Sequence, residues 1–115
     1  MRLVYLESPY AGGTPEEIEE NVRYARACMA DCLRRGEAPF ASHLLYTQPG
    51  VLRDEVKEER KLGMTAGFEW SKQAALTVVY TDRGITEGMK RGIELASGLC
   101  RAIEFRTLEG TDPVR

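Results

Sequence analysis

The chain has 115 residues, of which 43% are hydrophobic and 30% charged, and this fits one soluble globular domain. Its net charge of −2 does not supply the positive field of a duplex-DNA-binding protein. No apolar run reaches the roughly 18 residues of a membrane span, so we expect a cytoplasmic protein with neither nucleic-acid nor membrane partners. One histidine and three cysteines (28, 32 and 100) offer no recognisable metal-ligand spacing, and we expect no metal and no cofactor.

Short apolar segments alternate with helical patterns along the chain. Strands are predicted at residues 3–6, 38–41, 75–80 and 101–105. Helices are predicted at residues 15–35, 54–73 and 85–96, the second with a break at its glycines 63 and 67. Thr14 and Pro15 favour the first helix start, because threonine caps helices and proline suits the first helical position. Residues 42–53 are predicted as an apolar loop, and residues 107–115 as a polar tail after a single domain at 1–106.

This alternation predicts an α/β fold with a parallel sheet of about four strands in the order 2-1-3-4. Such a sheet between helices is a small flavodoxin-like (Rossmann-like) three-layer sandwich. The chain leaves strands 1 and 3 in opposite directions, so a crevice opens beyond their carboxyl ends. The segments 7–14 and 82–88 line that crevice, and residues 42–43 lie on its rim.

Both crevice loops carry residue types suited to an anionic ligand. The predicted ligand contacts are Ser8, Tyr10, Gly12, Gly13, Ser42, His43, Asp82, Gly84, Thr86 and Gly88. Glycines let backbone N–H groups approach a ligand, and two helix N-termini converge on the same point. The alternative is a pair of tight turns whose glycines serve only backbone geometry, with His43 as a structural side chain.

Glycosidic chemistry needs carboxylates, and the acids in the crevice are Glu7, Asp82 and Glu87. Asp82 also suits a helix cap or turn, and Glu87 also complements a helix dipole. Asp82 and Glu87 are the candidate catalytic residues.

Four segments together resemble the nucleoside 2-deoxyribosyltransferase-like proteins, including deoxynucleoside 5′-monophosphate N-glycosidases, and above all small members from bacteria and phages. These segments are Ser8-Pro9-Tyr10-Ala11-Gly12-Gly13, residues 41–46, residues 67–70 and residues 82–89. The resemblance implies that the first turn and the loop after the third strand hold a nucleotide's phosphate and sugar.

The resemblance does not extend to the family's catalytic acids. Its nucleophilic glutamate lies midway in a Gly-x-Glu-x-Gly pattern, which here reads Gly88-Met89-Lys90-Arg91-Gly92. Its assisting aspartate falls on Gly67. A lysine and a glycine cannot form a glycosyl–carboxylate intermediate.

We therefore expect a protein that binds a nucleotide or nucleotide-derived molecule without this cleavage. It would sense or sequester a signal, for instance an ADP-ribose-type immune messenger. The alternative is a nucleotide N-glycoside hydrolase or deoxyribosyltransferase that uses Glu87 or Asp82. A third hypothesis is a subunit without ligand; residues 44–46, Phe68 and Trp70 favour a contact in a homo-oligomer.

Overall fold

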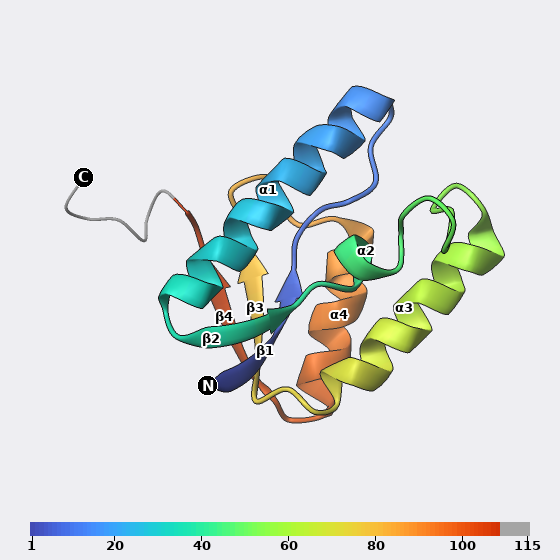
Figure 1. Cartoon of the computed structure of the whole chain (residues 1–115). Coiled ribbons are helices and arrows are strands. Elements are labelled where there is room, and N and C mark those ends of the chain that lie inside the picture. The colour runs from blue at the N-terminus through green and yellow to red at the C-terminus, as the bar shows by residue number, and fades with distance from the viewer. Residues whose placement is uncertain (109–115) are drawn as a thin grey trace.

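The computed structural model describes residues 1–108, which form a four-stranded parallel sheet flanked by helices (Figure 1). The strands are β1 (Arg2–Glu7), β2 (Glu37–Phe40), β3 (Leu76–Tyr80) and β4 (Ala102–Arg106). The helices are α1 (Pro15–Arg34), α2 (Ser42–Leu45), α3 (Lys57–Ser71) and α4 (Glu87–Gly98). All three strand pairs are parallel and the order is β2-β1-β3-β4, which confirms the predicted flavodoxin-like fold.

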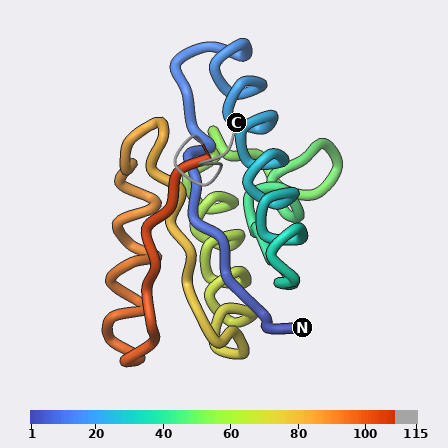
Figure 2. The backbone as a smooth tube through the Cα atoms, turned by 90° about the vertical axis from the view of Figure 1, so that its left-hand side faces the viewer, coloured from blue at the N-terminus to red at the C-terminus, as the bar shows by residue number. Residues whose placement is uncertain are grey.

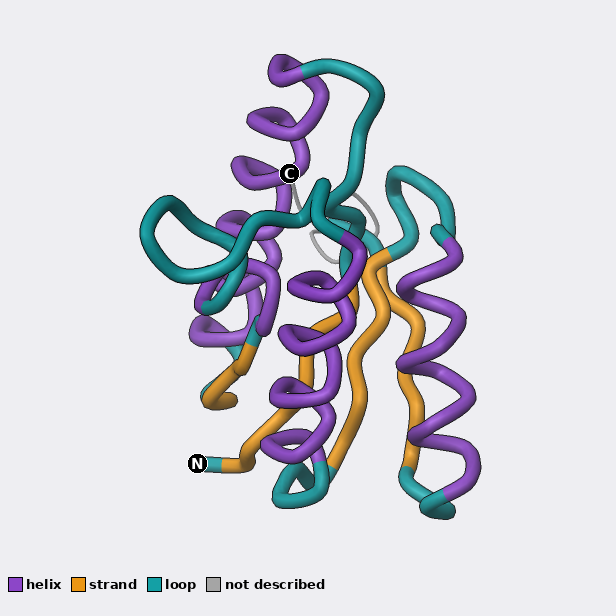
Figure 3. The backbone as a smooth tube through the Cα atoms, turned by 90° about the vertical axis from the view of Figure 1, so that its right-hand side faces the viewer, coloured by secondary structure: helices purple, strands orange, loops and turns teal. Residues whose placement is uncertain are grey.

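The sheet lies between α1 on one face and α3 with α4 on the other (Figures 2 and 3). Side chains alternate along β1, because successive residues of a strand point to opposite faces. Val4 and Leu6 join the core cluster formed with Tyr24 and other residues of α1. The odd-numbered residues of β1, including Glu7, therefore face α3 and α4, and this alternation places an acidic side chain beneath α4.

The first helix begins as the sequence predicts. Thr14 has an extended backbone, and its hydroxyl accepts a hydrogen bond from the Glu17 N–H at 3.2 Å. Pro15 is the first helical residue, where its missing N–H removes no intrahelical bond. This cap sets the direction in which the loop after β1 passes over the carboxyl end of the sheet.

The predicted break in the second long helix is wrong. α3 runs without interruption from Lys57 to Ser71, through both glycines. A Cβ at Gly67 would lie 2.6 Å from Ser42 Cβ and 2.7 Å from the Tyr5 hydroxyl oxygen. Gly67 is therefore a point of close approach between α3, α2 and β1, and it does not end the helix.

Two further differences concern the segment before α3. Residues 42–45, predicted as loop, form the short helix α2, and α3 begins at Lys57 instead of residue 54. Of the predicted polar tail, residues 109–115 lie outside the described residues. Leu108 is described, and it packs against the core cluster. Among residues 1–108, no helix is long and apolar enough to cross a membrane.

Candidate functional site

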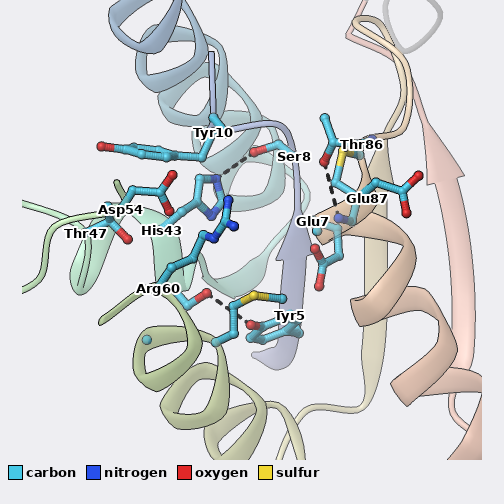
Figure 4. A pocket seen from close by; sticks show the side chains of 16 residues that line it. Tyr5, Glu7, Ser8, Tyr10, His43, Thr47, Asp54, Arg60, Thr86 and Glu87 are labelled. Carbon is cyan, nitrogen blue, oxygen red and sulfur yellow. Dashed lines mark hydrogen bonds between the residues drawn. The ribbon is translucent and has the colours of Figure 1, made fainter. Parts of the chain in front are cut away.

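A cavity of about 220 Å³ lies beyond the carboxyl ends of β1 and β2 (Figure 4). Four parts of the chain contribute to its lining: residues 5–11, residues 42–47, residues 54–64 and residues 86–89. This is the crevice that the strand order predicts, since the chain leaves β1 and β3 in opposite directions.

The fold brings together most of the predicted site residues and leaves four outside this cavity. Those that line it are Ser8, Tyr10, Ser42, His43, Thr86, Glu87 and Gly88. Those that do not are Gly12, Gly13, Asp82 and Gly84. Gly12 instead lines two neighbouring hollows. The segment after β3 therefore reaches the cavity only through residues 86–89, at the start of α4.

A hydrogen bond between Ser8 and His43 joins two walls of the cavity. Ser8 Oγ lies 2.8 Å from His43 Nε2, and the Tyr10 ring packs edge-on against the imidazole at 6.2 Å between ring centres. Burial lowers the pKa of His43 to about 4, so the imidazole is neutral at physiological pH. His43 thus contributes a neutral polar group and fixes the position of Ser8.

Asp82 holds the end of the sheet together and does not face the cavity. Its carboxylate accepts a hydrogen bond from the Tyr24 hydroxyl at 2.5 Å and another from the Leu108 N–H at 3.0 Å. Its own N–H donates to the Tyr24 oxygen at 3.0 Å. These contacts match the turn-forming role that the sequence also allowed for Asp82, and they direct its carboxylate away from a ligand in the cavity.

Glu87 lies on the rim of the cavity. Its side chain is 86% exposed and forms an ion pair with Lys90 at 3.2 Å. An exposed carboxylate beside a lysine is an ordinary helix-start arrangement, in which acidic groups favour the positive end of the helix dipole. The two candidate catalytic acids are therefore not paired across one reaction centre.

The acid that the structure places deepest in this cavity is Glu7. It is the last residue of β1, it is 8% exposed, and it lines the cavity next to Ser8. Burial raises the pKa of its carboxyl to about 8. The signal in the sequence is a carboxylate that directly continues an apolar strand, and this signal places Glu7 among the crevice acids without giving it a role.

The second residue missed from sequence is Arg60. It lies on α3, and Figure 4 shows its side chain extending into the cavity toward His43. Arg60 takes part in none of the ion pairs found among residues 1–108. Arg60 lies near Asp54. Burial raises the pKa of the Asp54 carboxyl group, and the positive charge of Arg60 partly offsets this rise. In sequence, the stretch 53–61 resembles a solvated helix face. Only the fold shows that Arg60 extends into the cavity.

The cavity adjoins a hollow of about 340 Å³, and both share Tyr10, Ala11, Asp54 and Arg60 in their lining. The lining of the cavity includes the Arg60 guanidinium, the hydroxyl groups of four serine and threonine residues, the Tyr10 ring and three carboxyl groups; the residues are Ser8, Ser42, Thr47 and Thr86, and Glu7, Asp54 and Glu87. A guanidinium with neutral polar groups suits a phosphate, and the ring offers a face for stacking.

The chain belongs to the family described as a domain of unknown function, DUF7768, whose model matches residues 2–106. No curated protein matches the chain. No solved structure matches it either.

Proposed function

We propose that this chain binds a nucleotide or nucleotide-derived small molecule in the cavity and does not cleave it by the route of the nucleoside 2-deoxyribosyltransferases. One observation carries the proposal: Arg60 extends into the same cavity that Ser8 and Tyr10 line. A guanidinium without an ion-pair partner among the described residues suits a phosphate, and a tyrosine ring suits a base.

The size of the site favours more than a bare phosphate. The cavity of about 220 Å³ adjoins a hollow of about 340 Å³, and Arg60 lies at their shared wall. A phosphate at Arg60 would have room for one organic group on each side. A molecule of the ADP-ribose type has that form, so sequestering or sensing such a signal remains our preferred role. A cytoplasmic location and a phage source would fit that role.

Isothermal titration calorimetry on the purified chain tests this proposal. The probes are nucleoside monophosphates, cyclic nucleotides and ADP-ribose, and we expect a saturable isotherm for at least one. Arg60→Ala should weaken binding by about tenfold or more, because a charge-assisted hydrogen bond contributes roughly 1.5–3 kcal/mol. Flat isotherms for every probe with the wild-type chain would overturn the proposal.

A matched control separates local contact from total charge. Arg91→Ala removes one positive charge from α4 at an exposed residue that does not line the cavity. This variant should bind the probes like the wild type. Equal losses in Arg60→Ala and Arg91→Ala would indicate non-specific attraction and count against a site at Arg60.

The alternative function, hydrolysis or transfer of an N-glycosidic bond by Glu87 or Asp82, has weaker geometric support. Glu87 lies on the rim and Asp82 binds Tyr24 and the Leu108 N–H. Release of base from a nucleotide by the purified protein, lost in Glu87→Gln and kept in Lys90→Ala, would favour the enzyme.

We also propose that the chain forms a homo-oligomer through the aromatic surface around Trp70. Trp70 is 57% exposed and stacks on Phe40 of the edge strand β2 at 5.7 Å between ring centres. In sedimentation velocity, Trp70→Glu should shift an oligomer toward monomer. Leu33→Glu changes a similarly exposed residue on α1 and serves as the control. A wild-type monomer at high concentration would refute the oligomer and leave the ligand site unaffected.

A further inference from the structure

Glu7 is a buried carboxyl group that forms no hydrogen bond or ion pair with the other residues that the structure describes. The residue is 8% exposed, and it lines the cavity that Arg60 enters. Within residues 1–108, burial alone accounts for the shift of its pKa, with no hydrogen bond or ion pair contributing. A buried polar group without a hydrogen-bond partner costs free energy.

The space for this carboxyl comes from α4. A Cβ at Gly92 would lie 1.8 Å from Glu7 Oε2 and 2.4 Å from Glu7 Cδ. The carboxyl group therefore fits against the helix backbone only because position 92 has no side chain. It lies between β1 and α4 and leads into the cavity that Ser8 and Thr86 also line.

The protonation state of Glu7 follows from its surroundings. Burial raises its pKa to about 8, so most molecules carry a neutral carboxylic acid at neutral pH. From β1, Tyr5 faces it, and the pKa of that phenol is raised by burial and further by Glu7 itself. From α2, His43 is neutral because burial lowers its pKa to about 4.

The charged groups of the same cavity are few. Arg60 from α3 is the cation, while Asp54 before α3 and Glu87 on α4 are the other acids. None of these three side chains forms a hydrogen bond or ion pair with Glu7 among the described residues. The hydroxyl groups of Ser8 and Thr86 line the same cavity.

We propose that Glu7 reads the ligand as a neutral carboxylic acid, donating a hydrogen bond to an anionic phosphate oxygen that Arg60 also attracts. The inference rests on the proposed function and names the chemical group that this site recognises. An ionised Glu7 would repel the same oxygen. Ligand binding and proton uptake by Glu7 are then linked, and the affinity falls as the pH rises.

The test is calorimetry of the full chain with adenosine 5′-monophosphate and ADP-ribose between about pH 7 and pH 9. The second ionisation of a phosphate monoester lies near pH 6, so the monophosphate keeps its charge in this window. Across a pKa of about 8, the protonated fraction of Glu7 falls about tenfold, and the affinity should fall equally. Repetition in two buffers with different ionisation enthalpies should show a proton taken up on binding near the upper end.

Glu7→Gln isolates the proposed bond, because an amide donates a hydrogen bond and does not ionise in this range. It should retain binding at about pH 7 and lose the pH dependence. Glu94→Gln, at an exposed position of α4 that does not line the cavity, should keep the slope of the wild type. Gly92→Ala should displace the Glu7 carboxyl and weaken binding, whereas Gly98→Ala on the same helix meets nothing within 4 Å.

Two results would overturn the inference alone. One is wild-type binding of either probe that does not weaken above pH 8. The other is a Glu7 carboxyl that titrates near its ordinary value of 4.5 in ¹³C NMR, with its resonance assigned by Glu7→Gln. Flat isotherms for both probes at every pH would instead overturn the proposed function and the inference together.

Discussion

The carboxyl group of Glu7 occupies the space that a side chain at position 92 would fill. The separation would be only 1.8 Å from an added Cβ to Glu7 Oε2. Gly92 lies inside α4, where glycine is less favourable than alanine by up to about 1 kcal/mol. Gly92 therefore lowers the stability of α4, and it makes room for the carboxyl group of Glu7 beside the cavity.

Replacement of Glu7 by glutamine should stabilise the protein, and more so at higher pH. The folded-state pKa of about 8 lies above the unfolded value of 4.5, so only the unfolded chain ionises between them. Wild-type stability should then fall as the pH rises from 4.5 to 8. In urea unfolding, the free energy of unfolding of Glu7→Gln should exceed that of the wild type by a few kcal/mol at about pH 8. The two values should be nearly equal at about pH 4.5. A constant difference between the two proteins would contradict this account.

His43 should oppose that trend on the acidic side. Its folded-state pKa of about 4 lies below the unfolded value of 6.5, so the unfolded chain binds a proton first as the pH falls. Its contribution to stability is present above pH 6.5 and is lost between 6.5 and 4. His43 is the only histidine, so its imidazole signals in ¹H NMR are unambiguous. We expect a midpoint near 4, and a midpoint near 6.5 would refute the buried state.

Gly67→Ala should destabilise the fold, although alanine is the better helix former. The added Cβ would lie 2.6 Å from Ser42 Cβ and 2.7 Å from the Tyr5 hydroxyl, so α2 or α3 must move. We expect a loss of roughly 1–3 kcal/mol in the free energy of unfolding.

Gly63→Ala on the same helix is the control for that experiment. Its Cβ would lie 3.1 Å from the end of the Leu52 side chain, which can adjust, and at an ordinary contact distance of 3.9 Å from Tyr46 Cβ. Gly63→Ala should be neutral or stabilising by up to about 1 kcal/mol. Similar effects of the two substitutions would mean that helix propensity, and not contact with Ser42, dominates.

Asp82→Asn should separate a structural role from a catalytic one. The substitution weakens the acceptor that Tyr24 and the Leu108 N–H share, at 2.5 and 3.0 Å. Thermal unfolding should show a loss of about 1–2 kcal/mol, while the affinity for nucleotide probes stays unchanged. A normal melting temperature together with lost binding or lost base release would return Asp82 to the site.

The strand order could be predicted from sequence because each strand is a short apolar run followed by a turn signal. The run 75–80 corresponds to β3, and Thr14 with Pro15 marks the start of α1 as expected. The crevice followed from that order. The glycines of α3 misled the prediction, because a glycine that ends a helix and one that permits close packing look alike in sequence.

Glu7 and Arg60 show why the interior of the site was less predictable. Glu7 points toward α4 because of the two-residue period of β1, but its depth depends on Gly92, more than eighty positions away. Arg60 lies in a run of charged residues, and among those on α3, at positions 57–61, the helix phase brings only Arg60 to the cavity. Both depend on contacts between distant segments, which spacing along one chain does not encode.

Trp70, which stacks on Phe40, gives the protein an intrinsic fluorescent probe. Trp70 is the only tryptophan in the chain, it is 57% exposed, and its indole N–H donates to the Tyr46 hydroxyl at 2.8 Å. Tyr46 directly follows α2, the helix that carries His43. The fluorescence of this single tryptophan therefore reports on a position next to both the exposed surface and the wall of the cavity. The emission wavelength of Trp70 should change when a second copy of the chain covers it, and the emission intensity should change when α2 moves. Neither measurement needs an attached dye.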